Sequence, residues 1–459
     1  MTDTLAYIDD NIDRFTEELK NFLRIPSVSA RSEHAADTRR AAEFVASEAR
    51  NIGLENVQIM ETDGYPVVYA DWLHAEGRPT VLLYGHYDVQ PPEPLELWSS
   101  GPFEPDVRAG ANGALNIYAR GSSDDKGQVF LHLKSFEAWI RTAGSLPVNV
   151  KMVIEGEEEI GSANLPAFLA AHRDLLACDA VMISDTSMYD YGMPGITYGL
   201  RGLAYFELHV TGAGTDLHSG MFGGPVANPI NALCEMIAKM KDGKGRITLP
   251  GFYDDVVLSD EERAQLARIP FDVEKFKADL DIPATTGEEG YSELERLWAR
   301  PTLDVCGIWG GYQGEGAKTV LPSRAAAKIS MRLVAHQDYH RVGDQLRQFV
   351  KENTPAGVRV EVVELHGGAP ALTPTNSAPV RAALAALEQA FGTKPFLIRS
   401  GGSIPIVADF EEQLGSPVVL MGFGLPDDRL HAPNEKMNLQ NFHRGIKSSA
   451  LFLQEYANL

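Results

Sequence analysis

Residues 81–91 read VLLYGHYDVQP, and this stretch indicates the fold of the chain. Four apolar or aromatic residues lead almost directly to His86 and Asp88, which are two positions apart. Side chains at positions i and i+2 of an extended strand point to the same side. The pattern predicts a buried strand that presents an imidazole and a carboxylate together at its end. Taken alone, it is more typical of an ordinary strand end whose polar side chains are satisfied by a loop, and other stretches of the chain are needed to favour a functional site.

The segments on either side of this stretch alternate between strand-like and helical patterns. The first 200 residues contain four strand-like runs, VVYADW, TVLLYGH, VNVKMVIEG and AVMISD, with helical patterns between the later ones. Such alternation indicates an α/β layer with a mixed, mostly parallel sheet flanked by helices. In these sheets, ligands bind beyond the carboxyl ends of the strands. We therefore expect a functional site at that edge.

The pattern changes near residue 200. ITYGLRGLAYFELHVTG, residues 196–212, reads as one long, half-alternating strand, which suits an antiparallel sheet with one covered face. Residues 254–300 are charged, and we expect them to be mostly helical. The α/β pattern resumes near residue 375. We predict a catalytic α/β domain formed by residues 1–200 and 375–459, interrupted by an inserted α+β domain at residues 201–374.

Length and charge limit the possible partners and compartment. The chain has 459 residues, more than one hydrophobic core usually serves, and a formal net charge of −22. That charge argues against nucleic acid or an anionic membrane as a partner, since both favour a basic patch. The three cysteines are widely spaced, which argues against a disulfide framework and favours a cytoplasmic protein. The acidic N-terminus does not resemble a signal peptide, and no apolar run predicts a membrane span.

Acidic residues and histidines follow several of the predicted strands. The stretches are GHYD (His86, Asp88), RGSSDDKG (Asp124, Asp125), EGEEEIGS (Glu157, Glu158, Glu159), MISD (Asp185) and LPDDRLHAPNE (His431). Nitrogen and oxygen ligands without sulfur suit zinc, manganese or cobalt. A carboxylate that bridges two such ions can hold them about 3.5–4 Å apart, as in two-metal hydrolases.

Two of these stretches suggest roles beyond ligation. Asp88 is placed to accept the second N–H of His86, which would fix the tautomer of the ring and make it a better ligand. Adjacent glutamates repel one another unless cations or protons relieve them. One can bind metal while its neighbour takes a proton as a general base. A solvated acidic loop is the alternative, but EGEEEIGS follows a buried-looking strand directly.

Together with TDLHSG and the late H-x-x-NE, these motifs resemble the di-metal aminopeptidase-like hydrolases. That family includes carboxypeptidase G, aminoacylases, succinyl-diaminopimelate desuccinylases and dipeptidases. The resemblance extends over nearly the whole chain. The carnosinase and cytosolic nonspecific dipeptidase branch is the most similar, at ITYGLRGLAYFELHVTG with DLHSGMFGG, at GAKTVLPSRAAAKISMRLV and at RSGGSIPI.

The resemblance implies a role for each residue of the metal site. His86 and Asp185 bind one metal, Glu159 and His431 bind the other, and Asp124 bridges the two. The resemblance further implies that Asp88 supports His86, that Glu158 is the general base for a metal-bridging hydroxide, and that Glu157 is structural. The peptide between Asp124 and Asp125 should be cis. Two divalent ions per subunit are expected, zinc first and manganese second.

The resemblance also implies a substrate site. His218 would polarise the scissile carbonyl of the partner subunit's substrate, as an oxyanion-hole group does. Thr319, also from the partner, would join Arg332, Ser403 and the backbone of Gly402 in holding a free carboxylate, which suits the arginine fork. These roles require a homodimer joined through the inserted lid and dimerisation domain. A salt bridge on the sheet surface is the alternative role for Arg332.

The expected function is two-metal hydrolysis of dipeptides or short peptides with a free C-terminal carboxylate. N-acyl amino acid deacylation or desuccinylation is the alternative, because Ser400 stands where the animal dipeptidases are expected to have an acidic residue. A metal-binding protein without catalysis is a third possibility, and the intact Glu158 argues against it. Of the remaining residues, we expect His132 to be packed or superficial and His366 to shape a loop, while Trp309 fits either a cleft or the core.

Overall fold

The protein is described from a computed structural model that covers residues 1–459 except Ala111 and Ser403. Contacts between residues divide it into two compact units. Unit 1 comprises residues 1–198, 373–398 and 409–459. Unit 2 comprises residues 199–372 and 399–408. The second unit therefore includes a short segment from late in the chain.

The main sheet is mixed, with a parallel centre. Its strands follow the order β1-β2-β6-β3-β7-β17-β8-β15, with β16 beside β8. The neighbours β6, β3, β7 and β17 run parallel, whereas β1, β2 and β8 pair antiparallel. The strands are β1 (Glu55–Met60), β2 (Val67–Trp72), β3 (Thr80–His86), β6 (Asn149–Glu155), β7 (Ala180–Ile183), β8 (Gly195–Leu200), β15 (Ala371–Leu372), β16 (Phe396–Ser400) and β17 (Val418–Leu420).

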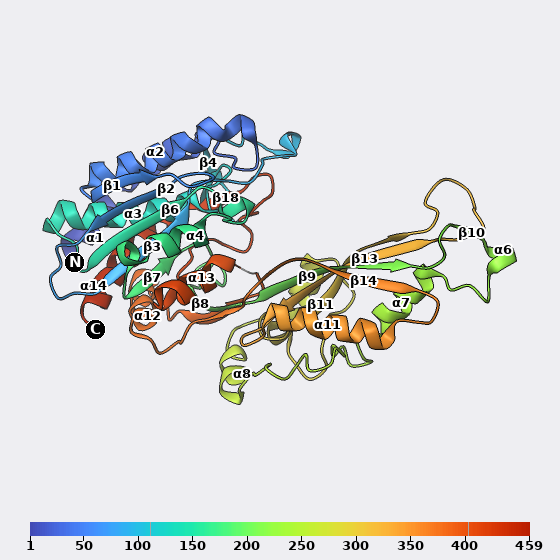
Figure 1. Ribbon diagram of the computed structural model, residues 1–459. Helices are drawn as coiled ribbons and strands as arrows, with labels where there is room; N and C mark the ends of the chain where they lie inside the picture. The colour runs from blue at the N-terminus through green and yellow to red at the C-terminus, as the bar shows by residue number, and fades with distance from the viewer. Residues whose placement is uncertain (111, 403) are drawn as a thin grey trace. The chain divides into compact units, whose positions relative to one another are not determined.

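Helices flank this sheet, as the sequence predicts (Figure 1). They are α1 (Thr2–Leu23), α2 (Ala35–Ile52), α3 (Lys126–Ala143), α4 (Leu165–Ala171), α5 (Arg173–Leu176), α12 (Ala378–Phe391), α13 (Pro405–Leu414) and α14 (Leu439–Ala457). A smaller sheet consists of β4 (Asp106–Ala109), β5 (Leu115–Tyr118) and β18 (Lys436–Asn438).

The middle of strand β3, residues 81–85, has only apolar or aromatic side chains because both faces of the strand are covered. Leu83 joins the core that contains Phe130 of α3 and Ile446 of α14. On the opposite face, the ring of Tyr84 contacts Phe410 of α13, with 5.1 Å between the centroids. Strands buried on both sides read as continuous apolar runs rather than as alternating ones. His86 follows this apolar run as the last residue of the strand, and its ring is itself buried.

Unit 2 is built on an antiparallel sheet. The order is β11-β13-β9-β14, formed by β9 (Gly202–Thr211), β11 (Thr302–Gly310), β13 (Arg324–Leu333) and β14 (Arg359–Gly368). A separate ribbon pairs β10 (Leu217–His218) with β12 (Val320–Leu321). The helices are α6 (Ser219–Phe222), α7 (Pro229–Lys239), α8 (Asp260–Leu266), α9 (Val273–Asp279), α10 (Glu293–Trp298) and α11 (Tyr339–Asn353). Alternate residues of β13, such as Ile329 and Met331, pack into the core beneath α7 and α11.

Two local predictions were wrong. Residues 196–212 do not form one strand, because the chain breaks at Arg201 and enters a different sheet. Strand β8 pairs with β17 and β15, whereas β9 pairs with β13 and β14. Residues 254–300 are mainly loop around three short helices. Prolines and glycines, such as Pro270, Pro283 and Gly287, interrupt that segment and keep its helices short.

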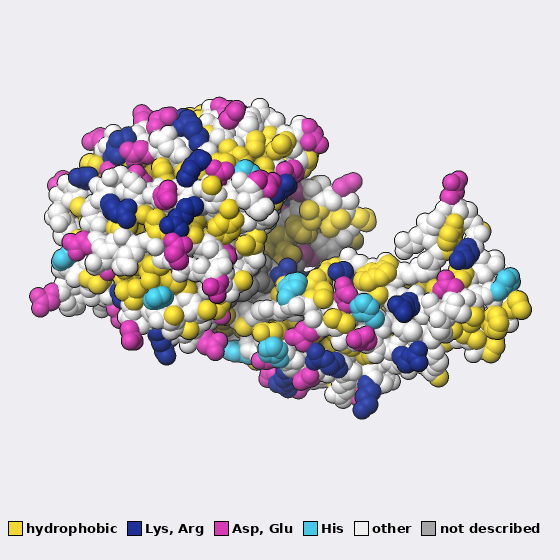
Figure 2. All heavy atoms as spheres, turned by 45° about the horizontal axis from the view of Figure 1, so that its top comes forward, with side chains coloured by type: hydrophobic (Ala, Val, Ile, Leu, Met, Phe, Trp, Pro, Cys, Tyr) yellow, Lys and Arg dark blue, Asp and Glu magenta, His cyan; other side chains and the backbone are white. Residues whose placement is uncertain are grey.

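Acidic and basic side chains are intermixed on the face shown in Figure 2. Among the described residues, no helix combines the length and the apolar character that a membrane crossing needs.

Candidate metal centre

His86 lies at the end of β3 with its ring fully buried. Its Nδ1 atom is 3.1 Å from the backbone oxygen of Asp88 and 3.4 Å from the Asp88 Oδ1 atom. Its Nε2 atom faces Asp124 Oδ1 at 3.2 Å and Asp185 Oδ2 at 3.8 Å. The expected support of His86 by Asp88 thus involves the backbone carbonyl as well as the carboxylate.

Asp124 lies between two histidines. Its Oδ1 atom faces His86, and its Oδ2 atom is 2.9 Å from Nε2 of His431. Although burial opposes ionisation, the hydrogen bond to His431 and the nearby imidazole of His86 lower the pKa of Asp124. One ionised carboxylate therefore presents one oxygen to each half of the site, which is what a bridging ligand requires. The peptide bond between Asp124 and Asp125 is cis, as the resemblance implies.

The first group of potential ligands consists of His86, Glu158 and Asp185, whose ligand atoms lie within 4.8 Å of one another. Burial, together with the nearby carboxylates, raises the pKa of Glu158 to about 9 and that of Asp185 to about 7. These carboxylates come from different strand ends, since Asp185 follows β7 and Glu158 follows β6. Without a cation, the group relieves its repulsion by holding protons.

The second group consists of Asp124, Glu159 and His431. His431 Nε2 is 3.2 Å from Glu159 Oε2, and hydrogen bonds to Asp124 and Glu159 raise the pKa of His431 to about 10. Gln90 also donates to Glu159 Oε2 at 2.9 Å. Gln90 lies two residues after Asp88 in the same loop, and no pattern in the sequence predicts this contact.

The carboxylate of Asp88 organises the glutamate turn. Its Oδ1 atom accepts the backbone N–H of Glu158 at 3.3 Å, and its Oδ2 atom accepts that of Glu159 at 3.1 Å. Ser29 donates its hydroxyl to the same Oδ2 atom at 2.6 Å. The backbone of both glutamates is therefore held against the end of β3.

Glu435 performs the same task for the Asp124 loop. Its Oε1 atom accepts the backbone N–H groups of Ser123 and Asp124, and its Oε2 atom accepts that of Gly121. Arg120 is ion-paired with Oε2 at 2.8 Å. Glu435 is fully buried. The late H-x-x-NE motif contained this residue, but its partner 311 positions earlier was not evident from the sequence.

The residues of this centre fit a pair of divalent cations. Nε2 of His86 is buried, and the described residues offer it no hydrogen bond, although two carboxylates face it. The donors are imidazole nitrogens and carboxylate oxygens, which suit zinc or manganese. His86 and Asp185 would hold one ion, Glu159 and His431 the other, and Asp124 both. Glu158 lies within the first group and is the remaining carboxylate.

The substrate residues predicted from the sequence lie in unit 2, where they form two sets. His218 and Thr319 are adjacent and exposed on the β10–β12 ribbon, since Ser219 donates its backbone N–H to the Thr319 oxygen at 3.1 Å. Arg332 lies near the C-terminal end of β13, whereas the ribbon precedes the N-terminal end of that strand. Gly402 donates its backbone N–H to Ser400 Oγ at 3.1 Å. Ser403 lies outside the described residues.

The other residues singled out by the sequence occupy varied positions. His132 is buried between the hydroxyls of Ser184 and Ser449, at 2.7 and 2.8 Å. Asn164 donates to both carboxylate oxygens of Glu157. His366 and Trp309 are exposed. His366 lies on β14, and Trp309 lies on the edge strand β11.

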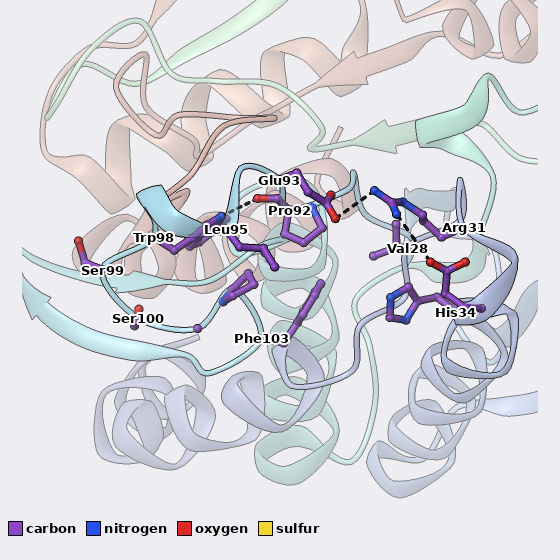
Figure 3. A pocket seen from close by; sticks show the side chains of 13 residues that line it. Val28, Arg31, His34, Pro92, Glu93, Leu95, Trp98, Ser99, Ser100 and Phe103 are labelled. Atoms are coloured by element: carbon purple, nitrogen blue, oxygen red, sulfur yellow. Dashed lines mark hydrogen bonds and ion pairs between the residues drawn. The ribbon is translucent and has the colours of Figure 1, made fainter.

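Unit 1 also contains a cavity of about 590 Å³ beside the loop that follows Asp88. Pro92, Leu95, Trp98 and Phe103 supply apolar side chains to its wall (Figure 3). The ion pair of Arg31 and Glu93, at 3.0 Å, spans one side (Figure 3). None of the six potential metal ligands lines this cavity. It is therefore separate from the metal centre.

Comparison with known proteins places this geometry in a family. The Cys-Gly metallodipeptidase DUG1 of Candida albicans is 34% identical over 463 residues, which cover 96% of this chain and 94% of the relative. The Beta-Ala-His dipeptidase of Homo sapiens is 33% identical, over 99% of this chain and 92% of the relative.

Solved structures agree. An M20 family metallo-carboxypeptidase from Sulfolobus solfataricus superposes with a TM-score of 0.82 at 33% identity, covering 97% of this chain and 99% of that one. Residues 82–455 match the family model described as Peptidase family M20/M25/M40. The matched range includes all six potential metal ligands. The chain belongs to peptidase family M20/M25/M40.

Proposed function

We propose that this protein is a two-metal dipeptidase that hydrolyses dipeptides or short peptides with a free C-terminal carboxylate. The observation that supports this most strongly is the position of Asp124, whose two oxygens face different histidines. The names of the Candida and human relatives support a dipeptide as the substrate. Zinc is the first proposed metal and manganese the second, because the donors are nitrogen and oxygen.

Each polar residue of the centre has a proposed task. When bound, two divalent ions supply Lewis-acid activation of water and of the scissile carbonyl. Glu158 accepts the proton that water loses and delivers it to the leaving amine. Its position next to Asp185 in a buried site supports this role, because carboxylates there hold a proton readily. Asp88 holds the backbone of Glu158 in place.

The substrate site is proposed to combine two subunits. Arg332, Ser403 and Gly402 bind the substrate carboxylate, while His218 and Thr319 come from the partner. Arg324 and Arg332 are eight residues apart on β13, which corresponds to about 26 Å. The ribbon with His218 lies beyond the Arg324 end of the sheet (Figure 1). A dipeptide spans only about 7 Å, so one subunit cannot contribute both ends. This supports a homodimer formed through unit 2.

A reducing cytoplasm is the proposed compartment. Cys178, Cys234 and Cys306 are all free thiols, which is usual for proteins of that compartment.

A substrate panel tests the proposed function. The metal-stripped protein would be reloaded separately with zinc and manganese, then offered free dipeptides alongside N-acetyl and N-succinyl amino acids. We expect cleavage of the free dipeptides. Cleavage of only the acylated compounds would contradict the proposal and make Ser400 the first residue to examine. Absence of turnover with both metals would contradict peptidase activity altogether.

A further inference from the structure

The predicted carboxylate-binding loop begins at Arg399, the penultimate residue of β16. Its side chain is 4% exposed, although it is an arginine. The guanidinium Nη2 atom makes an ion pair with Oε1 of Glu262, which lies on α8. Both residues belong to unit 2, although 137 positions separate them in the sequence. Removing Glu262 would leave the buried charge of Arg399 uncompensated. The ion pair therefore holds the side chain of Arg399 in place.

The next residues of the loop make further contacts within unit 2. Arg201 donates its Nε–H to the backbone oxygen of Gly401 at 3.1 Å. A Cβ atom at Gly401 would lie 2.8 Å from Arg201 Nη2 and 3.0 Å from the backbone oxygen of Leu297. The loop therefore packs directly against α10 and the start of β9. A side chain at position 401 would displace the guanidinium of Arg201 and crowd the carbonyl of Leu297, so glycine favours this close approach.

The helices that contact the loop form a connected block. Arg263 of α8 donates to Glu295 of α10 at 2.6 Å. Glu295 also completes a capping box with Ser292 at the start of α10. Capping and pairing of this kind stabilise helices that are too short to persist alone. Glu262 of α8 and Leu297 of α10 both contact the loop. They thus belong to two helices that are joined to each other.

Two residues that contact the loop share a cavity with the predicted carboxylate anchor. A space of about 650 Å³ is lined by Arg201, Leu297 and Arg332, among others. Arg332 and Ser330 occupy alternate positions of β13, and they face Thr302 and Asp304 across the ladder with β11. One cavity is therefore bordered by Arg201, which bonds to the loop, by Leu297 of α10, which packs against the loop, and by Arg332.

From these contacts we infer that the segment 254–300 positions the substrate-binding loop, with the Glu262–Arg399 ion pair as the principal positioning contact. This inference rests on the proposed function, because it assigns the loop to the substrate carboxylate. Glu262 is a positioning residue rather than a catalytic one. It acts through Arg399 on the backbone at Gly401 and Gly402.

The test compares Glu262→Gln with Glu261→Gln. Glu261 is the preceding residue of α8 and is exposed, so its variant controls for the loss of one charge. We expect Glu262→Gln to raise KM for a dipeptide about tenfold or more while kcat changes little, because the loop binds substrate and transition state alike. Metal content should match that of the wild type, whereas Tm should fall, because Arg399 stays buried without the carboxylate of Glu262. Glu262→Asp should recover part of the KM, since it retains the charge.

Hydrogen exchange of residues 396–408 provides a readout that does not depend on activity. The backbone amides there should exchange faster in Glu262→Gln than in the wild type or Glu261→Gln. If wild-type protein cleaves no dipeptide, the proposed function fails, while the exchange rates still test the ion pair. An unchanged KM with unchanged exchange would overturn the inference, as would a fall in kcat without a rise in KM. Should Glu262→Gln fail to fold, Arg399→Lys, which removes the guanidinium fork, is measured in the same way.

Discussion

Glu435 accepts the backbone N–H of Asp124, with 3.1 Å between Oε1 and the nitrogen. Because it also accepts N–H groups from Gly121 and Ser123, its carboxylate fixes the whole loop that presents Asp124. Glu435→Gln replaces one acceptor oxygen by an amide donor and removes the charge that Arg120 pairs with. We expect metal affinity to fall about 10- to 100-fold. Metal content after dialysis against graded chelator concentrations measures this.

Glu412→Gln is the control for that measurement, because Glu412 is exposed and lies in the same unit. It should leave metal affinity at the wild-type value. Equal affinity in both variants would show that Glu435 does not position Asp124.

Glu158 and Glu159 are adjacent, yet they belong to different groups of ligands. Glu158→Gln should lower kcat by about 10²–10⁴-fold with metal content intact, because a general base is lost and the proposed ligands remain. Glu159→Gln should instead lose one of the two metals. Elemental analysis alongside kcat distinguishes the two. Loss of metal in Glu158→Gln would make Glu158 a ligand rather than the base.

The separation of His218 from Arg332 predicts complementation. His218→Ala and Arg332→Ala should each be inactive as homodimers. In a mixed dimer, one site keeps its own Arg332 and receives an intact His218 from the partner, so random mixing should restore about a quarter of wild-type activity. Activity measured after the subunits have exchanged tests this. A mixture that stays inactive although mixed dimers are present would contradict catalysis in trans.

Burial lowers the pKa of His132 to about 3, so the folded protein keeps this ring neutral. The unfolded chain binds a proton there below about pH 6.5. Stability is therefore lost as pH falls through that value, by about 2 kcal/mol between pH 7 and pH 5. Denaturant unfolding of metal-stripped protein should show that much less pH dependence for His132→Gln. The exposed His340→Gln should retain the wild-type dependence, and an identical slope in all three proteins would refute the assignment.

The metal centre was accessible from the sequence because its signals are local. His86 ends an apolar strand, and Asp185 lies just after another, so both had to reach the same edge of a parallel sheet. The parallel centre of the sheet followed from the same reasoning. The family motifs supplied the role of Asp124, which periodicity alone does not give.

Other features depend on contacts between distant segments. The ion pair of Glu262 and Arg399 joins residues whose local patterns say nothing of each other. The sequence does not reveal the break at Arg201, because strand-like residues continue on both sides of it. Only the pairing of β8 and β9 shows that they belong to different sheets. The segment 254–300 has helix-favouring composition, but its prolines and glycines limit each helix to one or two turns.

The distance along β13 from the His218 ribbon to Arg332 also affects how activity depends on protein concentration. If His218 serves the neighbouring subunit, as proposed, an isolated chain has no complete active site, however well it folds and however much metal it binds. In dilute solution, where most chains are single, activity rises with the square of the protein concentration rather than in proportion to it. A cell that doubles its supply of such a chain gains more than twice the hydrolysis.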